Sequence, residues 1–130
     1  MNFKIIFIII SLGVIMAALF YIASGMAHER KDVVIEMTND LRFQPSSITI
    51  SVSDTVRWKN SSLLVHTVTA DPGLAANKED VNLPDGAKAF NSGNLDPEKE
   101  FEHKFKVPGQ YKYFCIPHEG AGMTGEVVVK

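Results

Sequence analysis

Hydrophobic and polar positions follow two different patterns along the chain. Residues 5–23 form an almost unbroken apolar run, IIFIIISLGVIMAALFYIA, without a charged side chain. From Val33 onward, short runs of β-branched and aromatic residues recur between turn residues. Alternation with a period of two is typical of strands that bury one face. The first pattern predicts one N-terminal hydrophobic helix, and the second predicts an all-β domain.

The alternation is clearest in the segment EFEHKFKV, residues 100–107. Phe101, His103 and Phe105 share one face of this segment, and charged side chains take the other, so we interpret His103 as structural. The segments predicted to form strands are residues 33–37, 47–52, 55–59, 64–70, 100–107, 110–115 and 125–129. Short strands at this spacing, separated by turn residues, favour a Greek-key β-sandwich. Residues 73–94 are less regular and predict a loop with a short helical turn or an edge strand.

The N-terminal run leaves two interpretations open. Its length approaches the roughly 20 apolar residues that cross a bilayer, which favours an uncleaved membrane anchor within residues 1–27. A linker at residues 28–32 would then lead to the domain at residues 33–130. Alternatively, Gly25-Met26-Ala27 is an acceptable cleavage site for a secretory signal, and cleavage would leave a soluble periplasmic protein. Both interpretations place the domain outside the cytoplasm, in the periplasm or on the outer face of the membrane.

Composition narrows the function classes. The chain has 130 residues and a formal net charge of -2, with charges of both signs spread along it. This balance argues against binding to nucleic acid. A single cysteine excludes an internal disulfide and zinc sites built on paired cysteines.

One group of residues carries recognisable metal chemistry. Cys115, His118 and Met123 follow the spacing C-x2-H-x4-M in YKYFCIPHEGAGMTGEVVV, and His66 lies earlier, in LVHTVTA. A thiolate, two imidazoles and a weak thioether are the donors that select copper and suit both Cu(I) and Cu(II). We therefore predict that these four side chains bind one copper ion.

The same residues resemble a known family. The loop CIPHEGAGM is similar to the copper loop of plastocyanin. The segments FQPSSITISVSDTVRWKN, VHTVTAD, FNSGNLDPEKEFEHKFKVPGQYKYFC and TGEVVVK resemble bacterial plastocyanin-like cupredoxins. This resemblance covers residues 33–130. It implies a monomeric cupredoxin that is not an enzyme and that shuttles single electrons through one type 1 copper ion. Its partners would be larger redox proteins, such as a cytochrome or a membrane oxidoreductase complex.

The resemblance also assigns roles to individual residues. It implies that His66, Cys115 and His118 are equatorial ligands and that Met123 is the axial ligand. It implies two packing residues, Phe43 and Tyr111. It further implies an apolar docking patch around the edge of the C-terminal histidine, formed by Leu41, Leu63, Val65, Pro117 and Ala121.

The sequence departs from plastocyanin at three points. Thr67 stands where plastocyanin has the asparagine that braces the cysteine loop, and its hydroxyl could supply part of that hydrogen bonding. Phe114 stands where plastocyanin has a tyrosine at its remote electron-entry patch. Long acidic runs are also missing. These departures argue against the photosynthetic partners of plastocyanin and leave the predicted copper ligands unchanged.

Two other functions compete with electron transfer as interpretations of these residues. An enzyme with a Cys–His nucleophile needs an exposed thiolate, whereas Cys115 ends the aromatic run YKYF, which predicts a buried sulfur. A copper carrier that delivers the metal itself has the same ligand requirements, so the sequence leaves that alternative open.

Overall fold

A computed structural model of the protein describes residues 33–130. The hydrophobic helix predicted over residues 5–23 and the linker at residues 28–32 lie outside the described residues. Within the described part of the chain, no helix has the length and apolar character needed to cross a bilayer.

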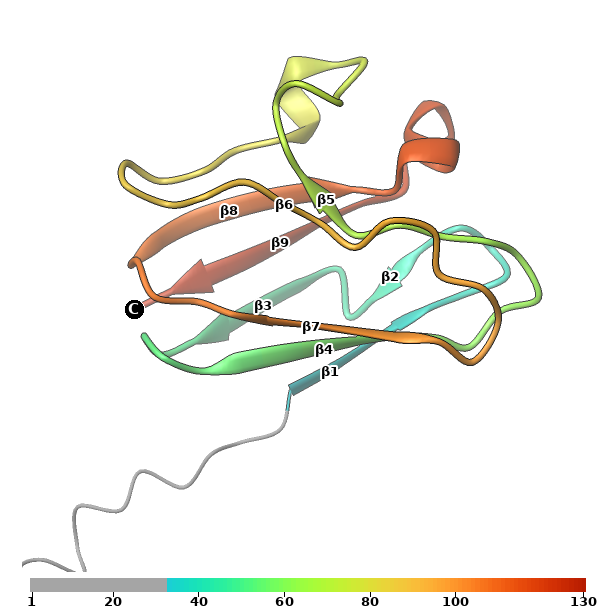
Figure 1. The fold of residues 1–130 in the computed structure, drawn as a ribbon, viewed down its shortest axis with the longest axis horizontal. Coiled ribbons are helices and arrows are strands. Elements are labelled where there is room, and N and C mark those ends of the chain that lie inside the picture. Colours follow the sequence, from blue (N-terminus) through green and yellow to red (C-terminus); the bar gives the residue numbers. More distant parts are fainter. Residues whose placement is uncertain (1–32) are drawn as a thin grey trace, which may run out of the picture. The chain divides into compact units, whose positions relative to one another are not determined.

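Within residues 33–130, nine strands form two sheets. The two sheets pack face to face (Figure 1). One sheet has the strand order β2-β1-β4-β7, and the other has the order β3-β9-β8-β5-β6. Both sheets are mixed, because β1 runs parallel to β4 and β3 runs parallel to β9. The predicted all-β sandwich is therefore confirmed. The strand bounds are β1 Val33–Met37, β2 Phe43–Gln44, β3 Ser47–Ile50, β4 Thr55–Asn60, β5 Thr69–Ala70, β6 Phe90–Asn91, β7 Glu100–Lys104, β8 Gly109–Phe114 and β9 Thr124–Val129.

The alternation seen in the sequence becomes a two-faced strand in the structure. In β4, Val56 and Trp58 are completely buried, whereas Arg57 and Lys59 lie on the partly exposed face. On that outer face, Nε of Arg57 lies 3.0 Å from the carboxylate of Glu102 on β7. Apolar side chains on the inner faces of both sheets can therefore leave water together, which provides the main driving force for folding.

Trp58 lies at the centre of the core between the sheets. Its ring centroid is 5.4 Å from that of Tyr113 on β8, at an interplanar angle of 82°. The ring of Phe43 also packs edge-on against that of Tyr113, with a centroid distance of 4.7 Å. Such edge-to-face contacts are favourable beyond the area they bury. Phe43 and Tyr111, the two expected packing residues, are both buried.

The strand topology places the segments that carry the predicted ligands at one end of the sandwich. There β4 ends at Asn60, β8 ends at Phe114 and β9 begins at Thr124. The first strand, β1, starts at the other end of its sheet, where Val33 pairs with Val56, which in turn pairs with His103.

The predicted strand over residues 64–70 is wrong for most of its length. Only Thr69–Ala70 forms a strand, β5, while an isolated bridge joins His66 to Leu95. The backbone N–H groups between these points bind side chains rather than a neighbouring strand. That of Thr67 donates to Sγ of Cys115, and that of Val68 donates to the hydroxyl of Ser92.

The irregular region holds both features that the sequence suggested as alternatives. A short 3-10 helix, η1, spans Lys78–Asp80, and the Asn77 side chain caps it by accepting from the N–H of Glu79. The edge strand β6 follows and pairs with β5. The two-residue strand β2 was not predicted, because so short a strand carries no periodic signal.

Candidate metal centre

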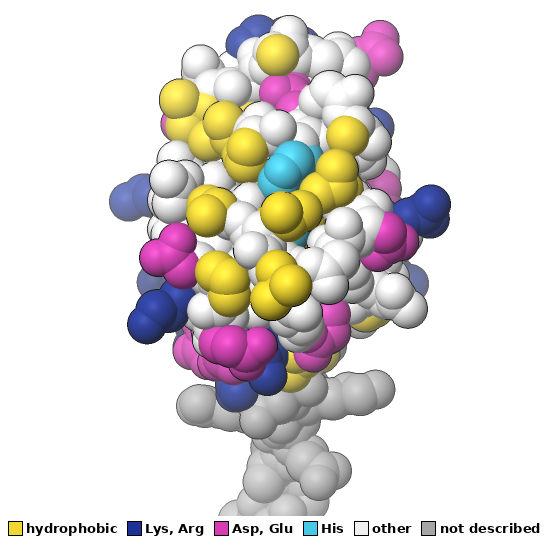
Figure 2. All heavy atoms as spheres, turned by 90° about the vertical axis from the view of Figure 1, so that its right-hand side faces the viewer, with side chains coloured by type: hydrophobic (Ala, Val, Ile, Leu, Met, Phe, Trp, Pro, Cys, Tyr) yellow, Lys and Arg dark blue, Asp and Glu magenta, His cyan; other side chains and the backbone are white. Residues whose placement is uncertain are grey.

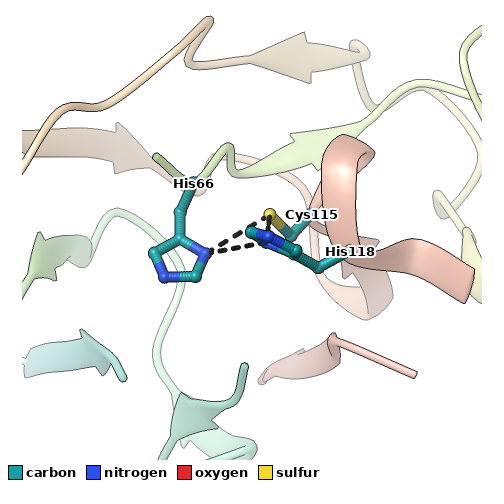
Figure 3. A group of neighbouring side chains, drawn as sticks. All are labelled: His66, Cys115 and His118. Carbon is teal, nitrogen blue, oxygen red and sulfur yellow. Dashed lines mark hydrogen bonds between the residues drawn. The ribbon is translucent and has the colours of Figure 1, made fainter. Parts of the chain in front are cut away.

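Three of the predicted ligands converge at the end of the sandwich where β8 ends (Figure 3). His66 lies between β4 and β5, Cys115 directly follows β8, and His118 lies in the 3-10 segment η2, Ile116–Ala121. Sγ of Cys115 is 3.6 Å from Nδ1 of His66 and 3.4 Å from Nδ1 of His118. The two Nδ1 atoms are 3.2 Å apart. A thiol and two imidazoles therefore face one small volume from two distant parts of the sequence.

Met123 lies directly beside this group. Its carbonyl accepts a hydrogen bond from the N–H of Cys115 at 3.0 Å, and its own N–H donates to the carbonyl of His118 at 3.2 Å. Its side chain is fully buried, in the same hydrophobic cluster as Cys115. Its role as an axial ligand stays a prediction.

Thr67 also holds the cysteine loop. Its backbone N–H donates to Sγ of Cys115 at 3.3 Å, and its hydroxyl accepts from the N–H of Ile116 at 2.8 Å. The hydroxyl of Thr69 donates in turn to Oγ1 of Thr67 at 3.1 Å. The predicted bracing role of Thr67 is confirmed, and a second threonine supports it.

Asn60 fixes the segment that carries His66, a role that the sequence did not reveal. Its buried amide group donates to the carbonyls of Leu64 at 2.7 Å and Leu95 at 2.9 Å. The backbone of Leu95 also exchanges two hydrogen bonds with that of His66. The signal available in the sequence was the position of this asparagine, which continues the alternation of the apolar residues Val56 and Trp58 in β4. That pattern is compatible with a structural amide but does not require one.

Glu119 is a second residue that sequence reasoning missed. It is buried although it follows His118 in a short loop, and its carboxylate accepts hydrogen bonds from the N–H groups of Ala76 and Asn77. A charged residue among glycines is normally exposed, so no signal in the sequence indicated this contact.

Burial shifts the pKa values of two of the predicted ligands, His66 and Cys115. It lowers the pKa of His66, the adjacent His118 ring adds to this decrease, and the backbone of Thr38 partly offsets it. Burial also raises the pKa of Cys115, although hydrogen bonds from Thr67 and His118 act in the opposite direction. In the metal-free protein at pH 7, His66 is therefore neutral and Cys115 is a thiol.

The donor set and its surroundings fit a copper ion. The donor atoms of His66, Cys115 and His118 lie within 4.8 Å of one another. Neutral imidazole is the metal-binding form of histidine, and a thiolate with two imidazoles is the trigonal donor set of blue-copper sites. The Thr67 N–H can stabilise charge on the sulfur. Cys115 and His66 are both fully buried, which limits the access of water.

Comparison with known proteins gives the same assignment. Residues 30–130 match the family model described as copper binding proteins, plastocyanin/azurin family. A plastocyanin from Scenedesmus fuscus is 37% identical over 106 residues, which cover 76% of this chain and 100% of that protein. A plastocyanin from Synechococcus sp. (strain JA-2-3B'a(2-13)) is 34% identical over 130 residues, covering 94% of this chain and 89% of that protein. The solved structure of a pseudoazurin from Sinorhizobium superposes with a TM-score of 0.61 at 26% identity, covering 76% of this chain and 73% of that one.

Protonation of Cys115 predicts that metal uptake releases acid. A metal ion binds the thiolate, so uptake at pH 7 should displace about one proton per ion, while neutral His66 should contribute none. Calorimetric titration with redox-inert Zn²⁺ in two buffers of different ionisation enthalpy would measure this number. Affinity should rise with pH until the pH exceeds the thiol pKa, since fewer protons are then displaced. Cys115→Ser is the control, and proton release near zero from the wild type would contradict the prediction.

Proposed function

The chain belongs to the plastocyanin/azurin family of copper-binding proteins, and from this membership we infer that it is a type 1 copper protein that carries single electrons between redox partners. The observation that carries this inference is the convergence of a buried thiol with two imidazoles at the end of a cupredoxin sandwich. Members of the family are electron carriers rather than enzymes. The full burial of Cys115 agrees with this, because a nucleophilic cysteine must be exposed to its substrate.

We assign His66, Cys115 and His118 as the equatorial ligands and Met123 as the weak axial ligand. A copper ion held there would supply a single electron by cycling between Cu(I) and Cu(II). The contribution of the protein is to keep its ligands in one arrangement during that cycle. Thr67 restrains the sulfur and Asn60 restrains the His66 segment.

His118 provides the proposed route for electrons. Its side chain is partly exposed, and Figure 2 shows a histidine surrounded by apolar side chains at this end of the domain. Most of the apolar collar comes from the segments that carry the ligands. Four residues expected in this collar from the sequence are exposed: Leu63, Val65, Pro117 and Ala121. We propose that the exposed apolar side chains of Leu64, Leu74 and Ile116, on the same or neighbouring loops, extend it. Leu41, also expected there, is only partly exposed.

The alternative route through Phe114 has less support. Phe114 is fully buried and forms a cluster with Ala75 and Val81, which cover it. A phenylalanine also lacks the hydroxyl that a tyrosine would offer to a partner. The collar around His118 therefore remains the better candidate for docking. A small apolar interface suits a partner that must dissociate quickly after each transfer.

We further propose that the domain works outside the cytoplasm and is held at the membrane by residues 5–23. The apolar composition of this run supports the proposal. Cleavage after Ala27 is the competing outcome, and it would leave residues 28–130 as the mature protein.

Copper binding through Cys115 predicts a visible colour. The oxidised, copper-loaded domain should show an intense thiolate-to-copper charge-transfer band, because this band requires sulfur bound to the metal. Absorption spectra should show its loss in Cys115→Ser and its loss or displacement in His66→Gln. His103→Gln is the matched control, since this half-buried histidine packs on Phe90 outside the cluster. A colourless wild-type Cu(II) form would exclude a type 1 site, and metal transfer to an acceptor without redox cycling would favour a copper carrier.

Docking through the collar predicts a local effect of charge. Leu63 is 84% exposed, so Leu63→Asp should leave the fold and the visible spectrum unchanged. It should slow electron exchange with a cytochrome partner about tenfold or more, because docking would then desolvate a charge. Val52→Asp is the control, since Val52 is also an exposed apolar residue but lies near the C-terminal end of β9. Stopped-flow rates at several salt concentrations would separate docking from long-range charge effects, and equal rates for all three proteins would rule out this surface.

Anchoring predicts the mass and location of the mature protein. If residues 5–23 remain attached, the protein should sediment with membranes, and its intact mass should correspond to a chain that begins near Met1. A mass corresponding to a start at about His28 would instead show cleavage of a signal. Copper binding should be the same in both forms, because no predicted ligand precedes His66.

A further inference from the structure

One side chain, Glu119, joins the metal-binding loop to a second loop. Glu119 directly follows His118, yet only 9% of it is exposed. Its Oε2 accepts a hydrogen bond from the N–H of Ala76 at 3.0 Å, and its Oε1 accepts one from the N–H of Asn77 at 2.9 Å. Both oxygens act as acceptors, as they do in an ionised carboxylate.

The second loop, residues 71–81, also packs against the residue that precedes Cys115. Its two buried apolar side chains, Ala75 and Val81, form a cluster with Phe114. The loop is therefore fastened on two sides of the ligand pair, by apolar contact next to Cys115 and by the Glu119 carboxylate next to His118.

Glu119 is also tied into the metal-binding loop through its backbone. Its carbonyl accepts from the N–H of Gly122 at 2.8 Å, while the carbonyl of His118 accepts from the N–H of Met123. A displacement of Glu119 would therefore be transmitted to both flanking predicted ligands. A carboxylate removed from water is costly unless its acceptor sites are satisfied, so the two amides of the second loop hold it in one position.

We propose that Glu119 is a positioning residue, which locks the metal-binding loop against residues 71–81 and keeps a shielded negative charge beside His118. The mechanical part concerns the metal-free protein, whereas the electronic part rests on the proposed copper function. A charge shielded from water acts more strongly on its neighbours than an exposed one. Because negative charge favours the more positive oxidised state of the site, Glu119 lowers the reduction potential.

The test compares Glu119→Gln and Glu119→Ala with Glu79→Gln. Glu79 lies in η1, within the same second loop, but is exposed, so its substitution changes the net charge equally without breaking the contact. In the metal-free protein, amide hydrogen exchange at Ala76 and Asn77 should accelerate about tenfold or more in the Glu119 variants, because hydrogen bonds to a charged acceptor are lost. In the copper-loaded protein, voltammetry should give a higher reduction potential for Glu119→Gln than for Glu79→Gln.

Each result decides part of the proposal. Wild-type exchange rates at both amides in Glu119→Gln would show that the carboxylate does not hold the second loop. A second outcome is that amide exchange is faster in Glu119→Gln, while its reduction potential and visible spectrum equal those of Glu79→Gln. This would show that Glu119 fastens the second loop but does not position the ligands. Should Glu119→Ala fail to fold, Glu119→Gln alone supplies both measurements, since it preserves size and removes the charge. The exchange measurement needs no metal, so it stands even if the charge-transfer band of the wild type is absent.

Discussion

The pairing of β8 with β9 is the constraint on which the metal-binding end of the molecule depends. Tyr113 pairs with Gly125 and Phe114 with Thr124, and the N–H of Cys115 then binds the carbonyl of Met123. Both ends of the loop that carries His118 are therefore fixed by a sheet whose strands are held by the core. A short loop closed by a ladder has few conformations, so its donors lose little further entropy when they meet one ion. The remaining predicted donor, His66, lies between β4 and β5 and must be held close to this loop by other contacts.

Buried polar side chains bring that donor into place and hold the surrounding loops. Asn60 orders the His66 segment, Thr67 joins it to the cysteine loop, and Glu119 joins that loop to the loop beyond it. A buried polar group left without a partner costs about 1–3 kcal/mol, so each of these contacts penalises any other arrangement. The resulting rigidity serves electron transfer, because a site that hardly rearranges suits both oxidation states. The polar groups contribute to the function by restricting movement and not by reacting.

Sequence periodicity predicted the architecture well where strands are long and weakly where they are short. The alternating strand β4 was placed nearly correctly, because one of its faces is buried and the other is partly exposed. The strand predicted over residues 100–107 was found as β7, but β7 ends at Lys104, and its inner face is only half-buried. Most of residues 64–70 was wrongly predicted as a strand. A β-branched composition does not reveal whether backbone N–H groups donate to a neighbouring strand or, as at Thr67, to the sulfur of Cys115. The ligand spacing identified the metal chemistry, and the resemblance supplied the bracing role of Thr67. Glu119 could not be predicted, because its partners are backbone amides of a loop far away in the sequence.

The direction of β1 makes the domain modular. Its first residue, Val33, lies in the same cross-strand row as His103, while its last, Met37, pairs with Asn60 at the metal-binding end. Any preceding polypeptide thus joins the domain at the end of the sheet that lies far from the partly exposed His118. A change in this preceding segment alters no predicted ligand and no collar residue, because all of them follow Val33 in the sequence. Evolution can consequently change the cellular location of such a carrier without changing its electron-transfer site.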